Sequence, residues 1–232
     1  MKIKIKIKNV EKIYPKFRLT IPEFNIEEGE TIKLYGNNGA GKTTFLRLIL
    51  DLIDKEKGTI YINNKSNNTF SNWKKKTASF LDESFLIQYL KVKEYFEFLA
   101  DVYKVSKKTT SEISLLAQNF LDIEPILDVK INSLSTGNKV KVGILGTLLV
   151  DANLLIFDEP TANLDPKSRS SFISLIKKYR QENTCTIIIS SHDLNTTYSI
   201  DGRNIILDIG EIAYNELDSS SSRKDIENLL LT

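Results

Sequence analysis

The chain has 232 residues, enough for one large domain or for one domain with a subdomain inserted in it. Its formal net charge is only +2, with 32 Lys and Arg against 30 Asp and Glu, which argues against a protein that coats nucleic acid. One cysteine, Cys185, excludes an intramolecular disulfide and a cysteine-rich zinc site, and one histidine, His192, excludes a histidine-cluster metal site within one chain.

The N-terminal segment has a strand pattern and lacks the apolar run of a signal peptide. Ile3, Ile5 and Ile7 alternate with lysines, the period-2 pattern of a strand with one face in solvent. Apolar runs further along, such as Leu148–Val150 and Leu154–Phe157, fall far short of the roughly 20 residues that span a bilayer. We therefore expect a soluble, cytoplasmic chain.

Strand and helix patterns alternate along the rest of the chain. Further strands are predicted at residues 31–35, 59–62, 154–157, 186–190 and 204–207, the last opening a hairpin over 204–215. Helices are predicted at residues 43–52, 93–103, 113–120, 138–150, 167–179 and 225–230, the last preceded by a turn and N-cap at 219–222. This order predicts an α/β fold with a mostly parallel central sheet. The stretch from about Asp82 to Lys141 is rich in helix and has no strong strand signal, so we expect a helical subdomain inserted in a single domain of residues 1–232.

The segment after the strand at 31–35 has the pattern of a phosphate-binding loop. Residues 36–43 read G-N-N-G-A-G-K-T and match G-x4-G-K-[ST], a pattern that this composition produces by chance about 0.007 times. Glycines let backbone N–H groups turn inward, and the following helix adds partial positive charge. Lys42 can reach the β- and γ-phosphates, the Thr43 hydroxyl can coordinate Mg²⁺, and Thr44 can reach the α-phosphate. The predicted phosphate-binding residues are Gly36, Asn37, Asn38, Gly39, Ala40, Gly41, Lys42, Thr43 and Thr44.

Two adjacent acids follow the apolar strand at 154–157. Ligands of open α/β sheets bind at the carboxyl ends of the strands, so Asp158 and Glu159 are expected near the phosphate loop. Asp158 suits Mg²⁺ coordination, and Glu159 suits the alignment or deprotonation of a water that attacks the γ-phosphate. A solvated pair at a strand end is the alternative, and the upstream loop favours the functional interpretation.

Three further segments in fixed order make the sequence resemble the ATP-binding cassette (ABC) ATPases. Residues 134–138, L-S-T-G-N, are similar to the family's LSGGQ signature; residues 162–165, A-N-L-D, to its D-loop; and residues 191–193, S-H-D, to its switch histidine. Tyr14 precedes Gly36 by 22 residues, where the family places an aromatic that stacks on adenine. Taken singly these signals are weak, because Ser135 could be an ordinary N-cap and Tyr14 could simply pack.

The resemblance covers residues from about 3 to 215 and implies a fold, a cofactor and partners. The fold is that of a P-loop NTPase with an N-terminal antiparallel β subdomain, a mostly parallel core and an inserted helical subdomain. The cofactors are ATP and Mg²⁺. The implied assembly is a head-to-tail dimer, in which each ATP lies between the phosphate loop of one subunit and the signature of the other. Its implied site residues are Tyr14, Ser135, Gly137 and Asp165 for the nucleotide and Glu159, His192 and Lys42 for catalysis. A monomer should bind ATP and hydrolyse it poorly.

The sequence departs from the family at two places. Alignment puts Asp82 where the family has a glutamine that touches Mg²⁺ and the lytic water, while Gln88 falls six residues late. An aspartate could hold Mg²⁺ through water without copying the geometry of glutamine, so Asp82 joins Thr43 and Asp158 as a metal candidate. The signature has Thr136 and Asn138 in place of a glycine and a glutamine.

The leading functional hypothesis is the ATPase subunit of a membrane transporter whose permease is a separate chain. Residues 94–100 resemble small exporter-type ATPases, which favours export over import and a place on the inner face of the cell membrane. The alternative is a non-transport ABC ATPase that drives a cell-envelope or division machine. A guanine-specific NTPase is disfavoured, because residues 64–67, N-K-S-N, lack the aspartate of an N-K-x-D motif.

Overall fold

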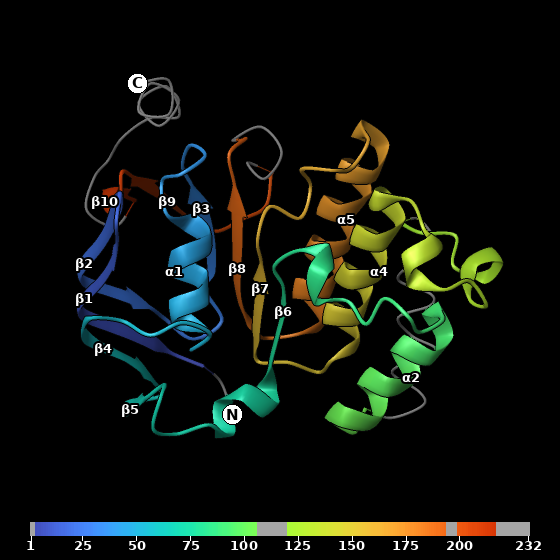
Figure 1. The fold of residues 1–232 in the computed structure, drawn as a ribbon, viewed down its shortest axis with the longest axis horizontal. Coiled ribbons are helices and arrows are strands. Elements are labelled where there is room, and N and C mark those ends of the chain that lie inside the picture. Colours follow the sequence, from blue (N-terminus) through green and yellow to red (C-terminus); the bar gives the residue numbers. More distant parts are fainter. Residues whose placement is uncertain (1–2, 106–119, 194–198, 217–232) are drawn as a thin grey trace.

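The computed structural model describes residues 3–105, 120–193 and 199–216 (Figure 1). The helices predicted at 113–120 and 225–230 and the turn at 219–222 lie outside these ranges, except for Phe120. Among the helices that are described, none is both long and apolar enough to cross a membrane.

One of the sheets is antiparallel, has the order β2-β1-β4-β5 and lies in the N-terminal part of the chain. It is formed by β1 (Ile5–Tyr14), β2 (Phe17–Ile26), β4 (Lys57–Ile62) and β5 (Lys65–Ser66). Ile5 and Ile7 of β1 are buried as the alternation predicts. Strand β2 was not predicted, because its apolar alternation at Leu19 and Ile21 shifts by one residue after Pro22.

The central sheet has the order β10-β9-β3-β8-β7-β6 and is parallel except for the β9–β10 pair. Its strands are β3 (Thr31–Tyr35), β6 (Thr77–Phe80), β7 (Leu154–Phe157), β8 (Thr186–Ser191), β9 (Arg203–Asp208) and β10 (Glu211–Asn215). The predicted mostly parallel sheet and C-terminal hairpin are confirmed. Strand β6 was missed because Thr-Ala-Ser-Phe has no apolar run.

Each face of the central sheet has its own hydrophobic core. On one face, α1 (Lys42–Ile49) lies between the central and antiparallel sheets, and on the other face pack α2 (Val92–Tyr103), α4 (Thr136–Leu149) and α5 (Pro166–Glu182) (Figure 1). Leu154 and Ile156 of β7 belong to the first core, while Leu155 and Phe157 belong to the second. Such a strand is buried on both faces, which explains its unbroken apolar sequence.

Helix α4 packs closely on its neighbours through two glycines. A Cβ atom on Gly143 would lie 2.3 Å from the ring of Phe80, and one on Gly146 would lie 2.8 Å from Leu99. Between β6 and β7 the described residues contain α2, α4 and the short 3₁₀ turns η2 (Glu83–Phe85), η3 (Glu124–Ile126) and η4 (Ile131–Ser133), with η1 (Asn72–Lys76) just before β6. In the same region an isolated antiparallel β-bridge pairs Lys91 with Lys130.

The turn between β9 and β10 packs against the loop that follows β3. Gly210 donates its N–H to the carbonyl of Ala40 at 3.0 Å and accepts from the N–H of Thr20 at 2.8 Å. A Cβ atom on Gly36 would lie 2.3 Å from the carbonyl oxygen of Leu207. The C-terminal hairpin and the loop at residues 36–41 are therefore in direct backbone contact.

Candidate active site

The loop between β3 and α1 has the conformation that its glycines allow. Gly39 and Gly41 have φ of 87° and 106°, in the left-handed region that side chains disfavour. Gly41 is the N-cap of α1, and a Cβ atom there would also lie 2.7 Å from the ring of Phe17. The loop thus presents the N-terminus of α1, a favourable place for an anion.

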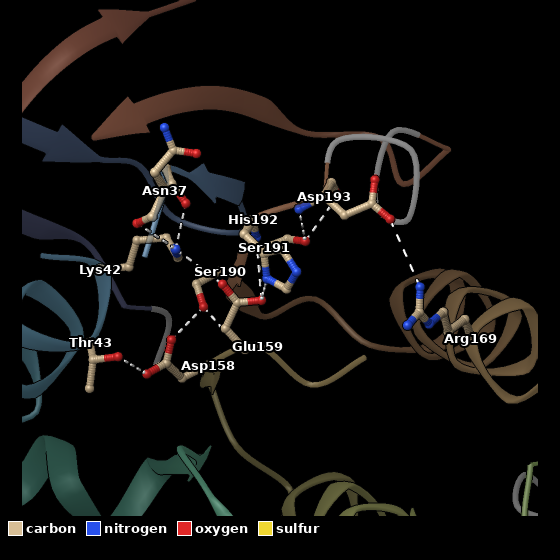
Figure 2. Close-up of polar contacts among 11 residues, drawn as sticks. Asn37, Lys42, Thr43, Asp158, Glu159, Arg169, Ser190, Ser191, His192 and Asp193 are labelled. Carbon is tan, nitrogen blue, oxygen red and sulfur yellow. Dashed lines mark hydrogen bonds and ion pairs between the residues drawn. The ribbon is translucent and has the colours of Figure 1, made fainter. Parts of the chain in front are cut away.

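Lys42 joins this loop to the acidic pair after β7. Its buried ammonium donates to the carbonyl of Gly36 at 2.5 Å and to that of Asn37 at 3.4 Å. The same Nζ lies 3.1 Å from Oε1 of Glu159 (Figure 2). A phosphate held by the loop would meet this ammonium directly.

Asp158 accepts hydrogen bonds from two hydroxyl groups. Thr43 Oγ1 donates to Oδ2 at 2.5 Å, and Ser190 Oγ donates to Oδ1 at 2.5 Å (Figure 2). Burial raises the pKa of Asp158 above its usual range, while the two hydroxyl donors pull it down. A threonine hydroxyl and a carboxylate at one point are ligands that Mg²⁺ prefers, so these residues fit the expected ion.

Glu159 and His192 form the outer part of the site. Nδ1 of His192 lies 2.8 Å from Oε2 of Glu159, and the His192 backbone N–H donates to the same oxygen at 3.3 Å. Glu159 has φ of 47°, unusual for a residue other than glycine. Its N–H donates to Ser190 Oγ at 2.8 Å, and its carbonyl accepts from the N–H of Ala162 at 3.1 Å, which holds this backbone.

Parallel register brings these residues to one edge of the sheet. Phe157 pairs with Ile189 and Tyr35 pairs with Ser191, so the residues that follow β3, β7 and β8 emerge together. The predicted Lys42, Thr43, Asp158, Glu159 and His192 converge there. Ser190 was not predicted as a site residue, because its place beside Asp158 depends on this register, which has no local signal in the sequence.

A cleft of about 520 Å³ extends from the loop to the end of β1. It is lined by Tyr14, Lys16, Phe17, Asn37, Asn38, Gly39, Gly41, Lys42, Thr43, Thr44 and Glu159. Tyr14 is 39% exposed, and its ring centroid lies 6.3 Å from that of Phe17. Lys16 and Phe17 were missed by sequence reasoning, while Gly36 and Ala40 contact the C-terminal hairpin instead of lining the cleft.

The signature and D-loop residues lie away from this cleft. Ser135 is the N-cap of α4 and accepts from the N–H of Asn138 at 3.3 Å. Asp165 is the N-cap of α5, and the Ser168 hydroxyl and N–H hold the pKa of its carboxyl below the usual range. A Cβ atom on Gly137 would lie 3.5 Å from the carbonyl of Asn163, so the start of α4 adjoins the D-loop.

Asp82 contacts other groups than the predicted Mg²⁺ ligands. Its Oδ1 accepts from the N–H of Ser84 at 2.7 Å, and its Oδ2 lies 4.0 Å from a guanidinium nitrogen of Arg47 on α1. Gln88, the other candidate, donates to the carbonyl of Glu83 at 3.4 Å. The role of Asp82 as a metal ligand stays a prediction: Phe80, two residues earlier, accepts the N–H of Asp158 at 2.9 Å, and Arg47 lies one helical turn from Thr43 on α1.

A phosphate loop between a central strand and a helix, with strand-end carboxylates beside it, defines a P-loop NTPase. The model of the ABC transporter family matches residues 19–162, more than half of the chain. The chain belongs to that family, and it is an ATPase that uses ATP with Mg²⁺.

Relatives within the family serve both directions of transport. The SkfA peptide export ATP-binding protein SkfE of Bacillus subtilis is 32% identical over 189 residues, 82% of this chain and 78% of that protein. The molybdate/tungstate import ATP-binding protein WtpC of Pyrococcus abyssi is 26% identical, and the match spans 94% of this chain but only 66% of WtpC. A dimeric post-hydrolysis structure of the ATP-binding cassette MJ0796, bound to ADP and Pi, superposes with a TM-score of 0.78 at 28% identity, over 91% of this chain and 97% of that one.

Proposed function

We propose that this chain is the ATP-hydrolysing subunit of a membrane exporter, in which ATP-driven closure of two such subunits moves a separate permease chain. The observation that carries the hydrolytic part is the convergence of Lys42, Thr43, Asp158, Glu159 and His192 at one edge of the sheet. We further propose that residues 1–232 form one ABC ATPase domain, with residues 82–141 as its helical subdomain.

In the proposed mechanism each residue at this edge of the central sheet has a separate role. Loop N–H groups and Lys42 bind the phosphates, and Tyr14 stacks on the adenine. Thr43 and Asp158 would hold Mg²⁺, which would supply positive charge against the phosphates. Glu159 accepts the proton of the attacking water, because its side chain lines the cleft beside Lys42.

His192 keeps Glu159 in place and contacts the γ-phosphate. Its Nδ1 is directed at the carboxylate, which leaves Nε2 for the substrate.

The proposed dimer supplies the groups that one subunit lacks at its cleft. Ser135 and Gly137 begin α4, whose first N–H groups and dipole favour an anion, and neither lines the cleft of its own subunit. A head-to-tail arrangement would set Ser135 of the partner subunit against the γ-phosphate. Asp165 would then face the junction between the two subunits.

The permease has a candidate docking groove on the side of the helices. A cleft of about 220 Å³ lies between α1, η1, β6, α2 and α4, and its apolar walls include Leu52, Trp73, Tyr95, Leu99 and Tyr103. Leu52 is exposed where it lines this groove, and other exposed large apolar side chains are Phe98 and Val102 on α2 and Tyr89 before α2. We propose that a cytoplasmic segment of the permease, with apolar side chains, fills this groove and holds the chain at the inner face of the membrane.

The exporter assignment is supported by the peptide-export relative SkfE and by the resemblance of residues 94–100 to exporter-type ATPases.

The test of the exporter assignment uses the membrane protein encoded by the neighbouring gene, co-expressed with the tagged chain. We expect the two to copurify, and Leu52→Asp to abolish copurification while ATP binding persists. In proteoliposomes with the ATPase outside, export predicts ATP-dependent uptake of whichever compound stimulates hydrolysis, and ATP-dependent release would indicate import. A neighbour without transmembrane segments would favour an envelope or division machine.

A further inference from the structure

Arg169 makes a second link, besides the Glu159–His192 contact, between the segments that follow β7 and β8. It lies in the first turns of α5, and its Nε donates to the carbonyl of Leu164 in the D-loop at 2.9 Å. Its Nη1 lies 4.0 Å from Oδ2 of Asp193, the residue after His192 (Figure 2). One guanidinium thus contacts the segment after β7 and the segment after β8.

The two contacts close a ring of interactions around the proposed catalytic pair. From Glu159 the chain continues through two tight turns, in which Ala162 donates to the Glu159 carbonyl at 3.1 Å and Leu164 donates to the Thr161 carbonyl at 3.2 Å. Arg169 then links Leu164 to Asp193, and His192 returns to Glu159 through its backbone N–H and its ring.

The segment that carries His192 has a second local tie. The Ser191 hydroxyl donates to the Asp193 carbonyl and accepts from the Asp193 N–H, both at 3.0 Å. A displacement of Asp193 is therefore passed to the turn that holds His192. The His192 side chain is about half exposed, so neighbouring side chains alone do not fix its ring.

We propose that Arg169 is a positioning residue for hydrolysis, which keeps the His192 ring on Glu159 by tying Asp193 to the D-loop. An arginine suits this role because its planar fork donates in two directions at once, which a lysine ammonium does less well. The inference rests on the proposed roles of Glu159 and His192. It adds a residue that touches neither substrate nor Mg²⁺ and acts through His192.

The expected effect is moderate, because both Arg169 and Asp193 are more than one-third exposed and solvent weakens their attraction. We expect Arg169→Gln to lower kcat by about three- to tenfold, with the KM for ATP unchanged within about twofold. Asp193→Asn, which leaves the bond to Leu164 intact, should lower kcat in the same direction. The matched control is Arg180→Gln on the same helix, where the arginine donates to the carbonyl of Asp201, outside this ring, and kcat should not change.

Single-turnover hydrolysis in a His192→Ala background separates positioning from general stability. If Arg169 acts through His192, adding Arg169→Gln to His192→Ala causes no further loss. A further loss of the same size, a raised KM with a lowered melting temperature, or an unchanged kcat would each overturn the inference. If Arg169→Gln does not fold, the same comparison is made with Asp193→Asn, alone and added to His192→Ala. Full hydrolysis by Glu159→Gln would instead refute the proposed site itself.

Discussion

Nδ1 of His192 lies 2.8 Å from Oε2 of Glu159, so the only imidazole of the chain contacts the carboxylate that is proposed to receive the proton of water. Because of this contact, His192→Ala should lower turnover by roughly tenfold or more, the usual range for such a group, and leave ATP binding near wild type. Single-turnover hydrolysis and nucleotide titration measure the two quantities. Unchanged hydrolysis in a dimer-forming sample would contradict the role given to His192.

Removing the carboxylate charge of Glu159 should trap an ATP-loaded dimer. Glu159→Gln keeps the shape of the side chain and its place beside Lys42, but the amide cannot accept the proton. We expect gel filtration with MgATP to show a dimer, and hydrolysis to fall by about a hundredfold or more. Lys42→Ala, which loses the phosphate contact, is the control and should remain monomeric. A monomer in both cases would argue against ATP-driven closure.

Ser190 is expected to matter for stability as well as for activity. Its hydroxyl donates to Asp158 and accepts from the Glu159 N–H, so Ser190→Ala leaves two polar groups without that partner. The free energy of unfolding should fall by about 1–3 kcal/mol, and activity should need more Mg²⁺. Ser191→Ala is the matched control for the Mg²⁺ requirement alone, since that hydroxyl bonds to the backbone of Asp193 and none of the hydrogen bonds described for it reaches Asp158. Equal effects of both variants would show that the carboxylate contact has no special weight.

Asp82 and Thr43 can be separated by their magnesium requirement. Thr43→Ala removes a hydroxyl that already contacts Asp158, and it should raise the Mg²⁺ concentration for half-maximal activity about tenfold or more. Asp82→Asn should change that concentration little, because the Asp82 carboxylate contacts Ser84 and Arg47. An equal increase for both variants would instead support the role of Asp82 as a metal ligand through water.

The buried carboxylate of Asp158 predicts a pH-dependent stability. Burial raises its pKa in the folded state, so the folded chain holds this proton at a higher pH than the unfolded chain does. The resulting destabilisation is fully present above the folded pKa, and it disappears as the pH falls through that value towards the unfolded pKa. Thermal unfolding should show Asp158→Asn more stable than wild type at about pH 8, with the difference shrinking towards about pH 4. A difference that stays constant over this range would contradict the raised pKa.

Much of the fold and most of the site could be predicted from the sequence, for physical reasons that the exceptions make clear. Strand β7 was predicted to the residue, because a strand buried on both faces must be apolar throughout. Strand β6 could not be predicted from the sequence, because its position is set by pairing with β7 and by the packing of Phe80 on Gly143. Such contacts between distant segments leave no local pattern.

The same distinction applies to the site. The loop at residues 36–43 could be predicted because its conformation requires glycines at fixed spacing. The position of Ser190 beside Asp158, by contrast, depends on the register between β7 and β8. The contact between Asp82 and Arg47, a residue on α1 that lies far from it in the sequence, could not be predicted either, and the role of Asp82 at Mg²⁺ stays a prediction. Lys16 and Phe17 enter the cleft through the turn after β1, which the sequence pattern did not predict.

The contact of the β9–β10 turn with the phosphate loop has a consequence for synthesis. β3 lies between β8 and β9, and Ala40 is bonded to Gly210, so the loop near the N-terminus is completed by residues made about 170 positions later. A growing chain on the ribosome therefore cannot hold a nucleotide in the finished cleft until the last hairpin has emerged. Until β8 emerges, the buried strand β3 has no neighbour in its sheet, and it has only one until β9 follows, so β3 is the segment that a nascent-chain chaperone would need to shield.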